Sequence, residues 1–203
     1  MRKNTYLMIA AAIAAAMPAQ SLAAEKTAIF AGGCFWCMEK DFEHVSGVAE
    51  VVSGYTGGML QNPSYRNHAG HDEAVRITYD PAVVSYESLL HTFWRSVDPT
   101  DAGGQFCDRG LSYTTAIFTA DAEEKALAEQ SKAELEQSKR LGAPIVTPIR
   151  DAGAFTIAEG YHQDYYKKNP VRYGFYRRGC GRDARIEALW GPEAHAGVVE
   201  KNS

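Results

Sequence analysis

The stretch Gly32-Gly33-Cys34-Phe35-Trp36-Cys37-Met38 sets the organisation of the chain around it. Two glycines end an apolar segment, and the residues that follow predict a short helix at 34–43. A thiol at a helix N-terminus lies near unpaired backbone N–H groups and the positive end of the helix dipole, so its thiolate is stabilised. Phe35 and Trp36 place apolar rings beside it. The stretch therefore predicts a reactive cysteine, Cys34, that acts on a small apolar group.

Length and charge limit the classes of protein to consider. The chain has 203 residues and a formal net charge of −4, without a basic patch, which disfavours nucleic acid and anionic membranes as partners.

The N-terminus resembles a targeting segment. Arg2 and Lys3 precede an apolar run of about 11 residues, which is short for a membrane span, and small residues follow it. This pattern predicts a signal peptide at 1–23, with an uncleaved anchor as the weaker alternative. Residues 24–203 then form a single domain of an exported protein, periplasmic or secreted, without stable membrane association and expected to be a monomer.

Hydrophobic periodicity gives a coarse order of secondary structure. Strands are predicted at residues 26–31, 45–55, 73–79, 113–119 and 145–150. Helices are predicted at residues 85–97 and 121–141, with loops over the site at 60–72 and 98–111 and a disordered stretch over the last ten or so residues. Because strands and helices are interleaved in irregular order, we expect an α+β fold: a two-layer sandwich with one mixed sheet.

The motif around Cys34 also resembles a known family. Gly33-Cys34-Phe35-Trp36 is similar to the active-site motif of peptide methionine sulfoxide reductase A, although that family usually has glycine where this chain has Cys37. Further blocks match in the expected order over roughly residues 28–191: Gly54-Tyr55-Thr56-Gly57-Gly58, Asn62-Pro63-Ser64-Tyr65-Arg66, Gly70-His71-Asp72-Glu73-Ala74-Val75, Phe93-Trp94 with Asp98-Pro99, Asp108-Arg109-Gly110 with Tyr113, Tyr161-His162-Gln163-Asp164-Tyr165, and Lys168-Asn169-Pro170. The resemblance implies a ferredoxin-like core with long coil segments.

The resemblance also implies an activity. Such an enzyme reduces methionine S-sulfoxide, free or in oxidised proteins, and is recycled by a thioredoxin-like dithiol without a bound cofactor. Cys34 would attack the sulfoxide sulfur, and Phe35 and Trp36 would form a dry slot for the S-methyl group. Glu73 would protonate the departing oxygen, because burial raises the pKa of a carboxyl group and holds it neutral.

Three further residues enter through the matched motifs. Tyr65 and Tyr113 can donate hydrogen bonds to the sulfoxide oxygen through their hydroxyl groups. Asp108, five residues before Tyr113, is expected to position the main chain of the substrate or a water molecule. Among the 11 tyrosines of the chain, only the motif match singles these two out.

The remaining cysteines are candidates for resolving a sulfenic acid on Cys34. Cys180 lies between glycines near the C-terminus, a flexible context that suits a resolving thiol, and we rank it first. Cys37 ranks second because it forms a Cys-x-x-Cys pair with Cys34. Cys107, directly before Asp108, ranks third.

Other functions fit parts of the same pattern. Cys34 and Cys37 could belong to a thioredoxin-like disulfide oxidoreductase, which would not need Glu73. Four cysteines in an exported chain could instead form two structural disulfides in a non-enzymatic binding module. His68 and His71 with Cys34 and Cys37 could be read as a zinc set, but the histidines belong to the block that ends in Glu73, so we expect no metal.

Overall fold

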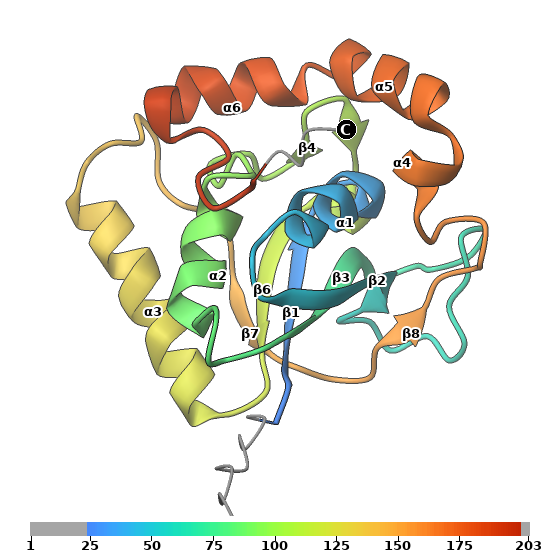
Figure 1. The fold of residues 1–203 in the computed structure, drawn as a ribbon, viewed down its shortest axis with the longest axis horizontal. Helices are drawn as coiled ribbons and strands as arrows, with labels where there is room; N and C mark the ends of the chain where they lie inside the picture. The colour runs from blue at the N-terminus through green and yellow to red at the C-terminus, as the bar shows by residue number, and fades with distance from the viewer. Residues whose placement is uncertain (1–23, 200–203) are drawn as a thin grey trace, which may run out of the picture.

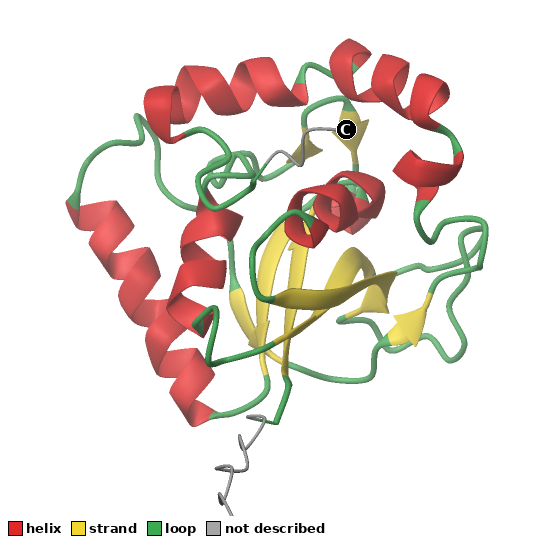
Figure 2. Cartoon of the chain, viewed as in Figure 1, coloured by secondary structure: helices red, strands yellow, loops and turns green. Residues whose placement is uncertain are grey.

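The chain folds around one mixed sheet, drawn yellow in Figure 2. The computed structural model describes residues 24–199, so the signal peptide predicted at 1–23 lies outside the described residues. The sheet strands are β1 (Lys26–Gly32), β2 (Val48–Thr56), β3 (Asp72–Tyr79), β6 (Thr115–Thr119), β7 (Ile149–Asp151) and β8 (Thr156–Ile157). A separate two-stranded hairpin consists of β4 (Gly104–Gln105) and β5 (Asp108–Arg109).

Six α-helices lie among the described residues. They are α1 (Phe35–Glu43), α2 (Tyr86–Trp94), α3 (Ala122–Gln137), α4 (Tyr165–Lys168), α5 (Pro170–Gly179) and α6 (Arg182–Trp190), with short 3-10 turns at Leu111–Tyr113 and Gly191–Glu193. Side chains cap the N-termini of α2 and α3: the Ser85 hydroxyl accepts from the backbone N–H of Ser88, and the Asp121 carboxylate accepts from that of Glu124. Among residues 24–199, no helix combines the length and the apolarity needed to cross a lipid bilayer.

The topology places β1, α1, β2, β3, α2 and β6 in a ferredoxin-like arrangement. The sheet order is β7-β6-β1-β3-β2-β8, and the four central strands β6, β1, β3 and β2 pair antiparallel with one another. Strand β7 extends the sheet in parallel beside β6, and β8 extends it beside β2. The expected α+β sandwich with a mixed sheet and a ferredoxin-like core is therefore confirmed.

The two faces of the sheet are covered differently, because successive side chains of a strand point to opposite faces. On the helical face, Phe30, Ile77 and Ile117 pack into the main core with α1, α2, α3 and α6. On the other face, coil residues such as Phe155 pack against small side chains and Phe118. Figure 1 shows α5 and α6 running end to end across one end of the sheet, next to α1.

Several expectations about local structure were wrong. Helix α2 ends at Trp94 rather than at residue 97, α3 ends at Gln137 rather than at residue 141, and β2 begins at Val48 rather than at residue 45. Residues 194–199 are not disordered: Val198 forms a β-bridge with Val45, and the backbone N–H of Val199 donates to the carbonyl of His44 at 2.8 Å. The strand expected from residue 145 begins only at Ile149, because the preceding segment hydrogen-bonds elsewhere, with the N–H of Val146 donating to the carbonyl of Pro99.

Candidate active site

A small cavity of about 70 Å³ lies where α1 begins. Its lining contains seven residues that the sequence singled out, together with one that it did not: Cys34, Phe35, Trp36, Tyr65, Glu73, Asp108, Tyr113 and Tyr176. These residues come from separate parts of the chain, so the fold gathers the predicted substrate-facing set in one place.

Sheet geometry brings Cys34 and Glu73 together. Strands β1 and β3 are antiparallel with Phe30 opposite Val75, so the chain leaving β1 toward Cys34 passes the start of β3, where Glu73 lies. Gly33 makes the turn into α1 with a φ of +79°, a conformation that favours glycine. A Cβ atom at Gly33 would lie 2.5 Å from that of Gln105, so a side chain there would also collide with the loop that carries Asp108.

Glu73 is buried, with 2% of its surface exposed. Its Oε2 atom accepts a hydrogen bond from the backbone N–H of Phe35 at 3.2 Å, and among the described residues no other group donates to this carboxyl. Burial raises the pKa of Glu73 to about 8, although the Phe35 N–H opposes this shift. At neutral pH the carboxyl group therefore carries a proton beside the Cys34 thiol.

The electrostatics of Cys34 differ from the expectation of a stabilised thiolate. Burial raises the pKa of the Cys34 thiol well above its ordinary value, and the neighbouring Cys37 and Glu73 add to this effect. One N–H of the helix start, that of Phe35, is bonded to the Glu73 carboxyl. The hydrogen bond from the Cys34 thiol instead lowers the pKa of Cys37 to about 7. The more acidic thiol of the pair is thus Cys37.

Stacked aromatic rings fix the apolar wall. The indole of Trp36 stacks on Tyr165 with ring centroids 3.7 Å apart, and its Nε1–H donates to Nδ1 of His162 at 3.0 Å. His162 is buried and also packs against Phe35 and Tyr65. The wall beside the thiol is therefore held rigidly by side chains behind it.

The hydroxyl groups at the cavity stay protonated. The pKa of Tyr113 and that of Tyr65 are raised, mainly by burial and then by the charge of Glu73, so both remain hydrogen-bond donors. Tyr65 is 42% exposed and lies at the mouth of the cavity.

Tyr176 was not predicted from the sequence. It lies on the polar helix α5, outside every matched motif, so nothing distinguished it from the other tyrosines. Its hydroxyl donates to Oδ2 of Asp108 at 2.5 Å and interacts with the Cys34 thiol.

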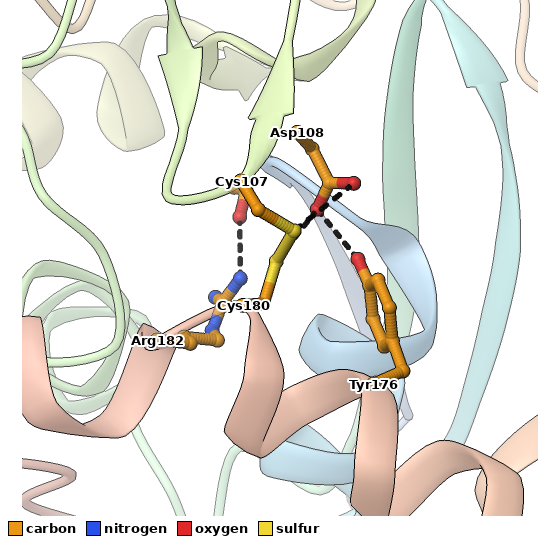
Figure 3. Close-up of a disulfide and its surroundings, with 6 residues drawn as sticks. Cys107, Asp108, Tyr176, Cys180 and Arg182 are labelled. Carbon is orange, nitrogen blue, oxygen red and sulfur yellow. Dashed lines mark hydrogen bonds between the residues drawn. A yellow bond between two sulfur atoms is a disulfide. The ribbon is translucent and has the colours of Figure 1, made fainter.

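A disulfide joins Cys107 to Cys180. Figure 3 shows it beside Asp108, whose Oδ2 atom lies 3.8 Å from Sγ of Cys180 and accepts from Tyr176. It links the β4–β5 hairpin, which carries Asp108, to the end of α5, which carries Tyr176. Cys180 therefore has no free thiol in this structure, and its first rank among the resolving candidates stays a prediction. The free cysteines are Cys34 and Cys37, which lie in contact within one buried cluster.

The hydrogen bonds of His68 and His71 do not fit a zinc site with Cys34 and Cys37. Both ring nitrogens of His71 are hydrogen-bonded within its own loop, to the N–H of Gly58 and the carbonyl of Leu60. His68 contacts the carbonyl of Ser64 and stacks on Tyr55. The histidines stabilise the loop over the cavity.

The chain belongs to the peptide methionine sulfoxide reductase family, whose model, described as "Peptide methionine sulfoxide reductase", matches residues 26–194. A relative from Rhizobium meliloti named peptide methionine sulfoxide reductase MsrA 2 is 53% identical over 186 residues, 90% of this chain and 91% of that protein. A protein of the same name from Caulobacter vibrioides is 51% identical over 94% of this chain and its own full length. The crystal structure of reduced Mxr1 from Saccharomyces cerevisiae superposes with a TM-score of 0.67 at 28% identity, covering 72% of this chain and 87% of that one.

Proposed function

We propose that this protein reduces methionine S-sulfoxide, free or in oxidised proteins, to methionine. The observation that carries the proposal is the cavity in which the Cys34 thiol, the protonated Glu73 carboxyl and the aromatic wall of Phe35 and Trp36 meet. Its volume of about 70 Å³ suits a methyl sulfoxide group rather than a whole amino acid. The main chain of the substrate would therefore stay at the mouth, where Tyr65 is exposed.

In this proposal each group at the cavity has a role. The S-methyl group lies against Phe35 and Trp36, and this leaves the sulfoxide sulfur facing Cys34. Glu73 gives its proton to the oxygen as the Cys34 sulfur attacks, with hydrogen bonds from Tyr65 and Tyr113. Methionine leaves with two electrons gained, and Cys34 becomes a sulfenic acid.

Cys37 is the resolving thiol in this proposal. It is the free cysteine in contact with Cys34, whereas Cys180 is bonded to Cys107. Attack of Cys37 on the sulfenic acid forms a Cys34–Cys37 disulfide and releases water. The Cys107–Cys180 disulfide then serves to hold Asp108 and Tyr176 against the cavity.

The alternatives account for less of the site. A thioredoxin-like oxidoreductase would use Cys34 and Cys37 but would leave a buried, protonated Glu73 without a purpose. A disulfide-linked binding module would have no free thiol, whereas Cys34 and Cys37 are both free here and Cys34 lines the cavity.

The surroundings of the reaction are part of the proposal. The Cys34–Cys37 disulfide needs an external dithiol, and a thioredoxin-like donor supplies two thiols for that exchange. From Arg2, Lys3 and the apolar run after them we infer export to the periplasm or outside the cell. We infer a monomer that needs no bound cofactor or metal and has no stable membrane or nucleic-acid partner.

A single-turnover experiment tests the proposal. The reduced protein receives one equivalent of methionine S-sulfoxide, and methionine release, free thiols and the new disulfide are measured. We expect one methionine per protein, loss of both free thiols and a Cys34–Cys37 bond by peptide mapping. A Cys34–Cys180 bond would return the resolving role to Cys180, and the absence of methionine would reject the activity.

A further inference from the structure

Two buried arginines, one on α5 and one on α6, act on the charge of the Cys37 thiol. Arg177 of α5 is 6% exposed and Arg182 of α6 is 1% exposed. Arg177 binds both oxygens of the buried Asp41 at 2.8 and 3.1 Å and also pairs with Asp183, which is partly exposed. Arg177, Arg182 and Asp41 therefore form a buried cluster with two positive charges and one carboxylate.

Arg182 lacks an anionic partner at hydrogen-bond distance. Its Nη atoms donate to the carbonyls of Gly32 and Ser96 at 3.0 and 2.7 Å, which are neutral acceptors. Its Nε atom has no hydrogen-bond partner and lies 4.0 Å from Asp41, whose oxygens already bind Arg177. A buried charge without compensation is costly, so a further negative charge in this cluster would be stabilised.

Cys37 is placed to supply that charge. It lies one helical turn before Asp41 and so shares its face of α1. It is 2% exposed, and Arg182 and Arg177 both favour its ionised form. The remaining groups that act on it are Cys34 and Asp41 of α1, Glu73 of β3, and Tyr173 and Tyr176 of α5. The Cys34 thiol donates a hydrogen bond that favours the Cys37 thiolate, whereas burial and Asp41 oppose it.

We propose that Cys37 rests as the thiolate of the pair and accepts the proton of Cys34 while Cys34 attacks the sulfoxide sulfur, with Arg177 and Arg182 as positioning residues for that anion. The inference rests on the proposed function and gives Cys37 a task before it resolves the sulfenic acid. It explains how a buried thiol such as Cys34 becomes nucleophilic only with substrate in place.

The step balances. Cys34 gives its proton to Cys37, and Glu73 gives its proton to the sulfoxide oxygen, which ends as the hydroxyl of the sulfenic acid. The substrate sulfur is reduced by two electrons and the Cys34 sulfur is oxidised by two. Cys37 then bonds to Cys34, and its proton leaves with the departing hydroxyl as water. Glu73 remains as the carboxylate until it takes a proton from solvent.

The first test asks whether Cys37 acts as a base in addition to resolving the sulfenic acid. Methionine release is followed in a single turnover between pH 6 and 8 for the wild type and for Cys37→Ser. The wild-type rate should level off near pH 7, whereas the variant should be about 100-fold slower at pH 7 and rise about tenfold per pH unit, because Cys34 must ionise alone. A variant that releases methionine at the wild-type rate with the wild-type pH profile would reduce Cys37 to a resolver.

A second test does not depend on sulfoxide reduction. Thiolate absorbance is titrated in the free enzyme, where Cys107 and Cys180 are bonded and do not contribute. Near pH 7 we expect a clear thiolate signal in Cys34→Ser, where the serine hydroxyl still donates to Cys37, and almost none in Cys37→Ser. The reverse pattern would overturn the proposal even if the enzyme reduces methionine sulfoxide.

The arginine is tested by a matched pair of variants. Arg182→Met removes the positive charge and Arg182→Lys keeps it. We expect the Cys37 titration to move to higher pH in Arg182→Met and to stay close to wild type in Arg182→Lys. If Arg182→Met does not fold, the same titration is read in the wild type at low and high salt, where a buried arginine predicts little change. Equal titrations in the two variants, or a large salt effect, would remove Arg182 from this role.

Discussion

Replacing Glu73 by glutamine should make the protein more stable and much less active. The amide keeps the size of the side chain and an oxygen that accepts from Phe35, but it has no proton to give. General acid catalysis is typically worth about 10²–10⁴-fold, and we expect Glu73→Gln to slow methionine release by a factor in that range. The measurement is single-turnover release at pH 7, under the conditions used for the wild type.

The stability part of this prediction follows from burial. With a pKa of about 8 in place of 4.5, roughly nine tenths of Glu73 is protonated at pH 7, against about one in 300 for an exposed glutamate. The folded protein thereby gives up about 3 kcal/mol at pH 7, because the unfolded carboxyl is ionised. Glu73→Gln regains up to that amount. The gain should vanish below about pH 4.5, grow as the pH rises and level off above about pH 8.

Urea unfolding of both proteins at several pH values checks the sign and the size of this effect. A variant with unchanged release rate would show that Glu73 does not transfer the proton. A variant less stable than wild type at pH 7 would show that the carboxyl is ionised in the folded protein. The central role of burial in this site would then be refuted.

Further predictions concern the thiols and the N-terminus. Cys34→Ser should abolish methionine formation completely, since oxygen is a far weaker nucleophile, and measurable turnover would reject Cys34 as the nucleophile. In wild type, kcat/KM should fall below about pH 7 as the thiol pair gains a proton, and above about pH 8 as Glu73 loses one. Glu73→Gln should lack the fall above pH 8. If the variant keeps that fall, another group causes it. The double variant Cys107→Ser/Cys180→Ser should still turn over with dithiothreitol, with a raised KM because Asp108 and Tyr176 are held less firmly; a stop after one methionine would instead make Cys180 essential for recycling. N-terminal sequencing of the exported protein should begin after residue 23 or 24, and Met1 at its start would favour an anchor.

The sequence was informative where a pattern repeats locally. The central strands and the helix capped by Ser85 carry clear periodicity, and the helix capped by Asp121 is rich in Ala, Glu and Lys, so the α+β class and the order of elements could be predicted. Strands of two residues, such as β4, β5 and β8, are too short to show a period. Helices α5 and α6 are rich in arginine and bury only part of their length, which left them as unassigned chain.

The active site likewise has residues that the sequence predicts and residues that only the structure shows. The lining around Cys34 could be predicted because its residues lie in motifs that match a family, and the sheet register then brings them together. Tyr176 lies outside these motifs, so only the structure reveals it. Four cysteines allow three pairings, and sequence spacing does not choose among them.

The acidity of the thiols also depends on long-range packing. Helix position alone favours a thiolate on Cys34, but burial and the bond between Glu73 and the Phe35 N–H act against it. The arginines beside Cys37 are about 140 residues away in the chain, so their effect appears only after folding.

The most direct test of the account is a turnover assay on the two epimers of methionine sulfoxide. The purified protein, with dithiothreitol as reductant, receives a racemic mixture, and methionine and both remaining epimers are separated and quantified over time. We expect methionine to form while the S epimer disappears and the R epimer persists, and we expect Cys34→Ser to form none. Consumption of the R epimer, or no methionine from either epimer, would contradict it.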